Sequence, residues 1–146
     1  MSAEIPSKLY TTDILALAVE LAAFPYDPTS ETHADIRSRS CGSTLAISLE
    51  HSETGAVNKL GLRVQACAVG QASAAIFARD ATGRTFEDIR AAKAVLMNWL
   101  SGAASAPHWA GIQLLHPARS YPGRHEAILM PWRAAILALS NAQTPS

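Results

Sequence analysis

Two cysteines, Cys41 and Cys67, are the side chains of this sequence best suited to bind a metal or to handle sulfur. Cys41 lies in Ser40-Cys41-Gly42-Ser43, where the glycine permits a tight turn between two extended segments. Cys67 follows a strand-like run and opens a helical one. A thiol at a helix N-terminus is pushed toward thiolate, because the unpaired N–H groups and the positive end of the helix dipole favour the anion. The competing interpretation is that both are ordinary buried residues, since free cysteine is among the most buried types.

Two further ligand types occur at the start of the last predicted helix, in Arg124-His125-Glu126. Together with Cys41 and Cys67, His125 and Glu126 would supply four ligands that zinc accepts. Neighbouring helical residues point in different directions, so at most one of these two should enter the site. Glu126 also has a simpler role, because an acid in the first turn offsets the helix dipole. A different use of His125 is as the base of a cysteine-dependent enzyme, with Cys41 as the nucleophile.

Composition and motifs exclude several other function classes. Twelve basic and twelve acidic residues cancel, which argues against binding to nucleic acid or to an anionic membrane. No phosphate-binding loop, dinucleotide fingerprint or nucleophile elbow is present, so nucleotide binding and serine hydrolysis lack support. The remaining histidines fall in predicted loops or helix ends and are interpreted as surface residues: His33, His51, His108 and His116.

The cellular setting follows from segments that the sequence lacks. No apolar run is long enough to span a bilayer, and Met1–Lys8 lacks the hydrophobic core of a signal peptide. We therefore expect a cytoplasmic protein. In a reducing cytosol, two cysteines are more readily metal-binding or reactive than paired in a structural disulfide.

The predicted elements are one helix, three strands and then further helices. Thr11 or Thr12 caps the first helix and Pro25 ends it. Alternating patterns predict three strands joined by short polar connections, which favours an antiparallel sheet. These strands are Ala34–Ser40, Leu45–Leu49 and Leu60–Ala66. At 146 residues the chain is predicted to be a single α+β domain, residues 1–146, with a frayed tail after about residue 140.

The second half of the chain is predicted to be helical. A helix over Gln71–Arg79 is followed by a capping box, Thr85 to Asp88, which begins a helix ended by Gly102. A short helix over Pro107–His116 is then ended by Pro117. The last helical segment is predicted over Ser120–Leu139, with Pro131 kinking it or lying near its first turn.

Three motifs in this order resemble the NifU/IscU-type iron–sulfur scaffold domain. They are the turn Ser40–Ser43, the helix start Ala66–Ala75 and the C-terminal stretch Tyr121–Trp132. The additional helical segment between Cys67 and the third motif is similar to the SufU branch. The resemblance extends from about Leu9 to Leu139. It implies a SufE/NifU-like α+β fold, with a three-stranded antiparallel sheet and helices packed on one face.

The sequence also departs from that family at two site positions. Family members hold zinc or a nascent cluster with three cysteines and an aspartate, and a cysteine accepts persulfide sulfur. Here the aspartate position is Ser43 and the third cysteine position is Ala127. The resemblance therefore carries over Cys41 and Cys67 as ligands, with Cys41 as the persulfide acceptor. Arg124 matches the family arginine, and it and Ser43 would support the site.

The resemblance implies an iron–sulfur cluster assembly scaffold that binds iron, zinc or a nascent cluster, or accepts sulfur, through Cys41 and Cys67. Such a protein is a scaffold or sulfur relay rather than a true catalyst. Its implied partners are a cysteine desulfurase and apo iron–sulfur client proteins. A cluster commonly takes four thiolates, so a homodimer is a further expectation. The alternative is a metal-free interaction or regulatory protein that keeps the fold and the desulfurase-binding surface.

Overall fold

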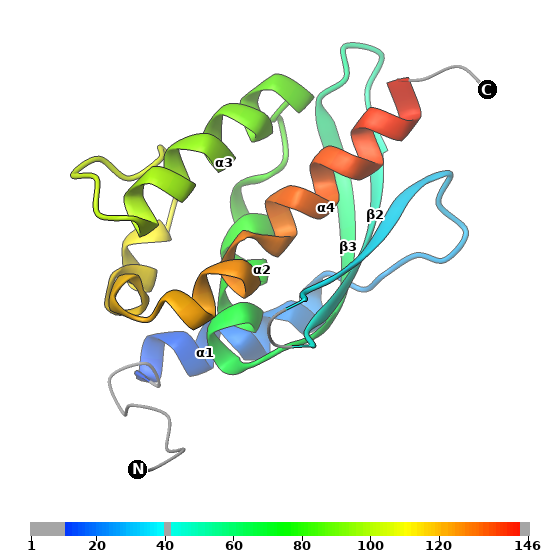
Figure 1. The fold of residues 1–146 in the computed structure, drawn as a ribbon. Helices are drawn as coiled ribbons and strands as arrows, with labels where there is room; N and C mark the ends of the chain where they lie inside the picture. The colour runs from blue at the N-terminus through cyan, green and yellow to red at the C-terminus, as the bar shows by residue number, and fades with distance from the viewer. Residues whose placement is uncertain (1–10, 40–41, 144–146) are drawn as a thin grey trace.

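The computed structural model describes residues 11–39 and 42–143, so Cys41 lies outside the described residues. The chain forms a three-stranded sheet, and Figure 1 shows helices on one side of it. The first half of the chain contains α1 (Thr12–Glu20), η2 (Leu21–Ala23), β1 (Thr32–Arg37), β2 (Thr44–His51) and β3 (Val57–Gln65). The second half contains α2 (Ala68–Asp80), α3 (Phe86–Leu100), η3 (Ile112–Ser120), η4 (Pro122–Arg124) and α4 (His125–Gln143). None of the helices in these ranges is long and apolar enough to cross a bilayer.

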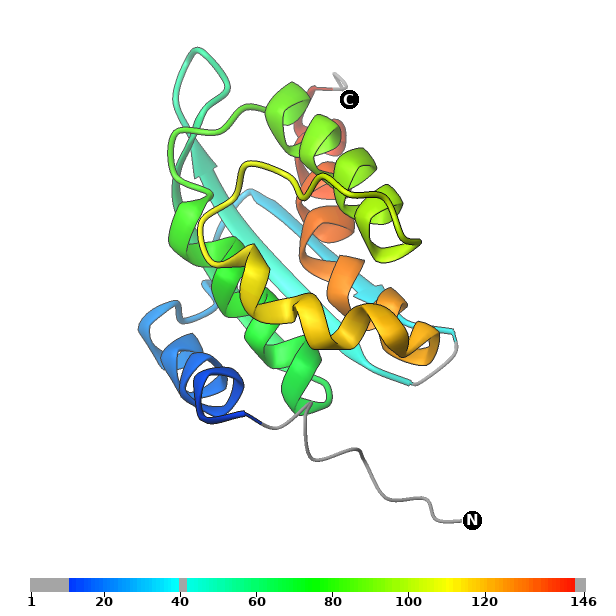
Figure 2. The ribbon, with the colours of Figure 1, turned by 90° about the vertical axis from the view of Figure 1, so that its left-hand side faces the viewer.

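The strands pair antiparallel in the order β1-β2-β3, with Ala34 opposite Ile47 and Ile47 opposite Leu62. Helix α4 packs on β1 and β2, and α2 packs on β3, so that both helices cover one face of the sheet (Figures 1 and 2). Helix α1 packs against α2, and α3 packs against α4. The predicted fold class is therefore confirmed.

Three aromatic rings fill the core between α2, α4 and the segment before η3. The ring centroids of Phe77, Trp109 and Trp132 lie 5.2 Å from one another in all three pairs. Trp109 donates through Nε1 to the Ile76 carbonyl at 3.0 Å. The Nε1 of Trp132 is buried and has no hydrogen-bond partner within the described ranges.

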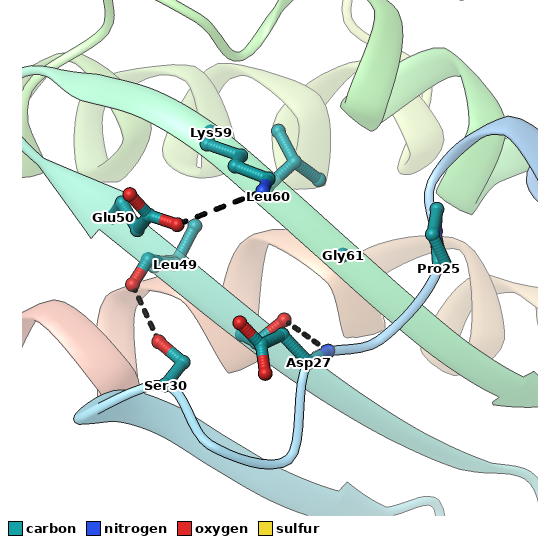
Figure 3. Close-up of a pocket in the computed structure, with 9 residues that line it drawn as sticks. Pro25, Asp27, Ser30, Leu49, Glu50, Lys59, Leu60 and Gly61 are labelled. Atoms are coloured by element: carbon teal, nitrogen blue, oxygen red, sulfur yellow. Dashed lines mark hydrogen bonds and ion pairs between the residues drawn. The ribbon is translucent and has the colours of Figure 1, made fainter.

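The loop before β1 crosses the other face of the sheet. A Cβ at Gly61 would lie 2.0 Å from the Pro25 carbonyl oxygen, so this close approach requires glycine. The Asp27 backbone N–H donates to Ser48 Oγ at 2.9 Å, and Ser30 Oγ donates to the Leu49 carbonyl at 2.8 Å. Figure 3 shows the small pocket left beneath the loop. Its volume of about 10 Å³ is room for a single water molecule, not for an organic ligand.

The structure agrees with most of the predicted elements and corrects two of them. The capping box is confirmed, since Thr85 Oγ1 accepts from the Asp88 N–H at 3.2 Å and Asp88 accepts from the Thr85 N–H at 3.0 Å. The helix predicted over Pro107–His116 is wrong. Gly111 has a φ of +86°, which interrupts a right-handed helix, and the 3₁₀ helix η3 follows with Pro117 inside it. The last helix begins at His125 rather than at Ser120.

Candidate functional site

Cys67 is the N-cap residue of α2, where the extended chain leaving β3 turns into the helix. Its backbone is extended, with φ −64° and ψ 168°, and its carbonyl accepts from the Gln71 N–H at 2.9 Å. The Gln71 side chain also donates to the Ala66 carbonyl at 2.8 Å and holds the strand end in place. The thiol makes no capping hydrogen bond and is half-buried. The predicted position of Cys67 at a helix start is therefore confirmed.

The start of α4 meets the start of α2 at Gly70. A Cβ built on Gly70 would lie 3.3 Å from Ala127 Cβ and 3.9 Å from Cys67 Sγ. It would also lie 2.9 Å from Ala66 Cβ, so only glycine fits between these neighbours. Ala127 itself is buried, with 2% of its surface exposed. The position that resembles the family's third cysteine thus lies beside Cys67, although it holds a methyl group instead of a thiol.

The connection between β1 and β2 is fastened to the first turn of α4. The Ser38 N–H donates to the Ser43 carbonyl at 2.8 Å, which closes the connection across its described ends. Ser38 and Ser43 are both buried, and Gly42 adopts a φ of +72°, a conformation that favours glycine. The Ser38 hydroxyl donates to the carboxylate of Glu126. The connection that carries Cys41 in the sequence is thereby tied to the residue before Ala127.

His125 faces a different neighbour. Its Nε2 lies 3.2 Å from the Ala118 carbonyl oxygen and 3.1 Å from that of Arg119, both at the end of η3. The Ala118 carbonyl also accepts from the Tyr121 N–H at 3.0 Å, so the ring lies against the hydrogen-bonded end of η3. Arg124 precedes it in η4 and is half-buried, with its backbone N–H donating to the Tyr121 carbonyl at 2.9 Å.

The donor set among the described residues is not a complete metal centre. No three His, Cys, Asp or Glu side chains within residues 11–39 and 42–143 gather closely enough to hold an ion. Cys67 offers one thiolate, the Glu126 carboxylate accepts from Ser38, and the His125 ring faces η3. A metal held by either His125 or Glu126 would have to replace these contacts.

Ser38 and Gly70 are the site residues that the sequence did not identify. Ser38 and Glu126 are 88 positions apart, and no local pattern connects them. Gly70 lies in a run of small residues, and the sequence does not distinguish a glycine that makes room for α4 from any other small residue of that run. Both depend on how α4 returns to the sheet.

The fold, with the starts of α2 and α4 meeting at Gly70, is similar to that of NifU-like proteins, and comparison with solved structures confirms the resemblance. A nitrogen-fixing NifU-like protein (N-terminal part) from Brucella abortus has a TM-score of 0.83 and 27% identity, covering 94% of this chain and 98% of that one. A protein from Fervidobacterium islandicum, assigned as an iron–sulfur cluster assembly scaffold for the SUF system, has a TM-score of 0.79. Its identity is 17%, which shows the fold alone, with 92% and 99% of the two chains covered. No protein-family model and no curated protein sequence matches the chain.

Proposed function

We propose that the chain acts as a scaffold-like protein in iron–sulfur cluster assembly, with Cys41 and Cys67 as its working thiols. The observation that supports this most is the position of Cys67, at the N-cap of α2 and beside Ala127, in a domain with the NifU-like fold. The side chain is half-buried, so a partner can reach it. The proposed setting is the cytoplasm, with a cysteine desulfurase and apo client proteins as partners.

Sulfur acceptance is the step for which two thiols are sufficient. The thiolate of Cys41 attacks the terminal sulfur of a persulfide on the desulfurase cysteine. A new S–S bond forms on Cys41, the S–S bond of the desulfurase breaks, and the desulfurase cysteine leaves as a thiolate. The number of electrons is unchanged, so no additional oxidant or reductant is required. Cys67 then serves as the neighbouring thiol of the site.

Iron, zinc or a nascent cluster would be cargo rather than a resident cofactor. Cys41 and Cys67 can contribute two thiolates, whereas a cluster commonly takes four ligands. His125 and Glu126 remain predicted ligands, each engaged with a protein group here. The described donors therefore do not fit a closed structural metal site, and a bound ion would retain positions open to outside ligands.

The contacts of Glu126 and His125 favour a second candidate function. A metal-free protein that keeps the scaffold fold and the desulfurase-binding surface would need neither residue as a ligand. Glu126 would then fasten Ser38, and His125 would complete the end of η3. The enzyme with a Cys41 nucleophile and a His125 base remains a prediction from the sequence.

Anaerobic incubation with a cysteine desulfurase and cysteine separates these functions. Intact-mass spectrometry should show one added sulfur on the purified chain, lost in Cys41→Ser and retained in Cys67→Ser. Zinc and iron are measured on the same samples by metal analysis. A sulfur adduct or a thiol-dependent metal supports the scaffold. A chain that binds the desulfurase but takes up neither sulfur nor metal is the metal-free protein.

A further inference from the structure

Strand β1 is the edge of the sheet that remains available for pairing. The β3 edge is closed, since the Leu62 N–H donates to the Phe24 carbonyl at 2.8 Å and the Val57 N–H donates to the Arg84 carbonyl at 2.9 Å. In contrast, β1 packs on β2 and under α4 (Figures 1 and 2). Among the described residues, the backbone groups of residues 33–37 make no hydrogen bonds outside the ladder with β2. Such an edge is a template for another strand.

The side chains along this edge carry charges in a self-complementary order. Residues 33, 35 and 37 are exposed and share the face of the sheet away from the helices, because alternate residues of a strand share a face. Residue 31, which is also exposed, lies one position before β1 begins and is taken to continue this alternation. In sequence they are Glu31, His33, Asp35 and Arg37. None of the four forms an ion pair within the described part of the chain. The edge thus has an acid at its beginning and a base at its end.

A second copy of the chain can pair with this edge about a two-fold axis, which requires directly opposed residues to share a face. With the axis at Ala34, Glu31 lies opposite Arg37 and His33 lies opposite Asp35. Symmetry makes each of these favourable pairs twice. With the axis at Asp35, that carboxylate opposes its own copy, and with the axis at His33, Glu31 opposes Asp35. An axis at Ile36 sets Asp35 opposite Arg37 but leaves Glu31 and His33 without these partners. Because opposed like charges destabilise a strand pair, the register centred on Ala34 is the one that gives all four charged or titratable side chains a favourable partner.

We propose that two copies of this chain associate through antiparallel β1–β1 pairing centred on Ala34, which joins their sheets into one. The surroundings of Glu31 also favour this pairing. Extending the β1–β2 register places Glu31 next to the like charge of Glu50. Glu50 already forms an ion pair with Lys59 at 3.9 Å. Arg37 of the second copy supplies the positive charge that Glu31 lacks. A single strand pair covers little surface, so the dimer is expected to be weak and concentration-dependent.

This arrangement places the two candidate sites far apart. Ser38 lies four residues beyond the axis in each copy, so the two Ser38 residues are about 27 Å apart along the paired strands. This pairing therefore does not bring the two Ser38–Glu126 contacts, one from each chain, into one site. The proposed dimer is independent of whether sulfur or metal is handled, and its test does not require either activity.

Sedimentation equilibrium of the full chain over a wide concentration range tests the proposal. The wild type should show a monomer–dimer equilibrium that weakens at high salt. Arg37→Glu should raise the dimer dissociation constant by about tenfold or more, since it sets like charges opposite each other twice. The double variant Glu31→Arg with Arg37→Glu reverses both signs and should restore the dimer. If Arg37→Glu acted by misfolding the chain, the double variant, which contains the same change, would not dimerise either.

Two controls make the outcome decisive. Arg90→Glu makes the same charge change on an exposed position of α3 and should leave dimerisation unchanged. A Cys41→Ser, Cys67→Ser double variant should dimerise like the wild type, so a failure of sulfur transfer does not affect this test. A chain that is monomeric at every concentration overturns the proposal. So does a dimer that is insensitive to Arg37→Glu or lost in the cysteine variant.

Discussion

The Ser38 hydroxyl donates to the Glu126 carboxylate and thereby joins the end of β1 to the first turn of α4. The two residues are 88 positions apart in the sequence, and Ser38 is buried with 1% of its surface exposed. The hydrogen bond between this carboxylate and a buried hydroxyl has a structural role, because it joins two elements of the fold. Glu126 therefore connects the sheet to the start of α4, where Ala127 lies near Gly70.

Loss of this contact should destabilise the domain. Glu126→Ala removes the acceptor from a buried hydroxyl and is expected to lower the free energy of unfolding by roughly 1–3 kcal/mol. Glu126→Gln keeps an acceptor oxygen and should cost less. Urea unfolding of both variants measures the difference. Glu87→Ala is the matched control, because Glu87 is an exposed acid in the first turn of α3 and loses only the favourable dipole term. Equal losses for Glu126→Ala and Glu87→Ala would contradict the role of Ser38.

A thiol at position 127 should strengthen metal binding. Ala127→Cys places a sulfur on a residue near Cys67, since a Cβ built on Gly70 would lie 3.3 Å from Ala127 Cβ and 3.9 Å from Cys67 Sγ. We expect the affinity for zinc to rise by roughly tenfold or more, because each additional thiolate contributes strongly to zinc binding. Competition with a chromophoric chelator measures this affinity. Ala135→Cys adds an equally buried thiol further along α4 and should have no such effect. An unchanged affinity for Ala127→Cys would separate this position from the site.

Gly70→Ala should be destabilising even though alanine is the better helix former. Its Cβ would lie 2.9 Å from Ala66 Cβ and 3.3 Å from Ala127 Cβ, so α4 or the end of β3 must shift. The expected cost is about 1–3 kcal/mol, as for other overpacked positions. Gly123→Ala is the control, since nothing lies within 4 Å of the added Cβ there. Thermal unfolding of the two variants compares them, and a stabilised Gly70→Ala variant would refute the crowding.

Acid should weaken the attachment of the loop that precedes η3. The hydrogen bond from the Ala110 N–H, together with the Arg84 guanidinium, lowers the pKa of Asp80 below its usual 3.8. Because the folded-state pKa is the lower one, the stabilisation is present above pH 3.8 and is lost as pH falls through the lowered value. Asp80→Asn should flatten the fall in stability between neutral and strongly acidic pH. Asp13→Asn, a first-turn acid of α1, is the comparison. If the stability of Asp80→Asn fell with decreasing pH as steeply as that of the wild type, Asp80 would not be a source of the acid sensitivity.

Local patterns predicted the parts of the structure that depend on neighbouring residues. Cys67 occupies the N-cap position of α2, and Thr85 pairs with Asp88, because strand ends and capping boxes are encoded within a few positions. The sequence could not predict that Ser38 meets Glu126, since that contact depends on the return of α4 across the sheet. Similarly, Trp109 bonds to the Ile76 carbonyl, and that tertiary contact helps to hold a turn where helical spacing predicted a helix.

The three-ring cluster of Phe77, Trp109 and Trp132 also has an optical consequence. Two indole rings with centroids 5.2 Å apart are close enough for their electronic transitions to couple, and the coupling depends on their 67° interplanar angle. The two rings belong to α4 and to the segment before η3, which both pack on α2. The near-ultraviolet circular dichroism of the chain should therefore depend on the position of α4 relative to the segment before η3. A shift of α4 that changes the Trp109–Trp132 geometry should change this circular dichroism signal, so the signal can be followed when a partner or an ion is added.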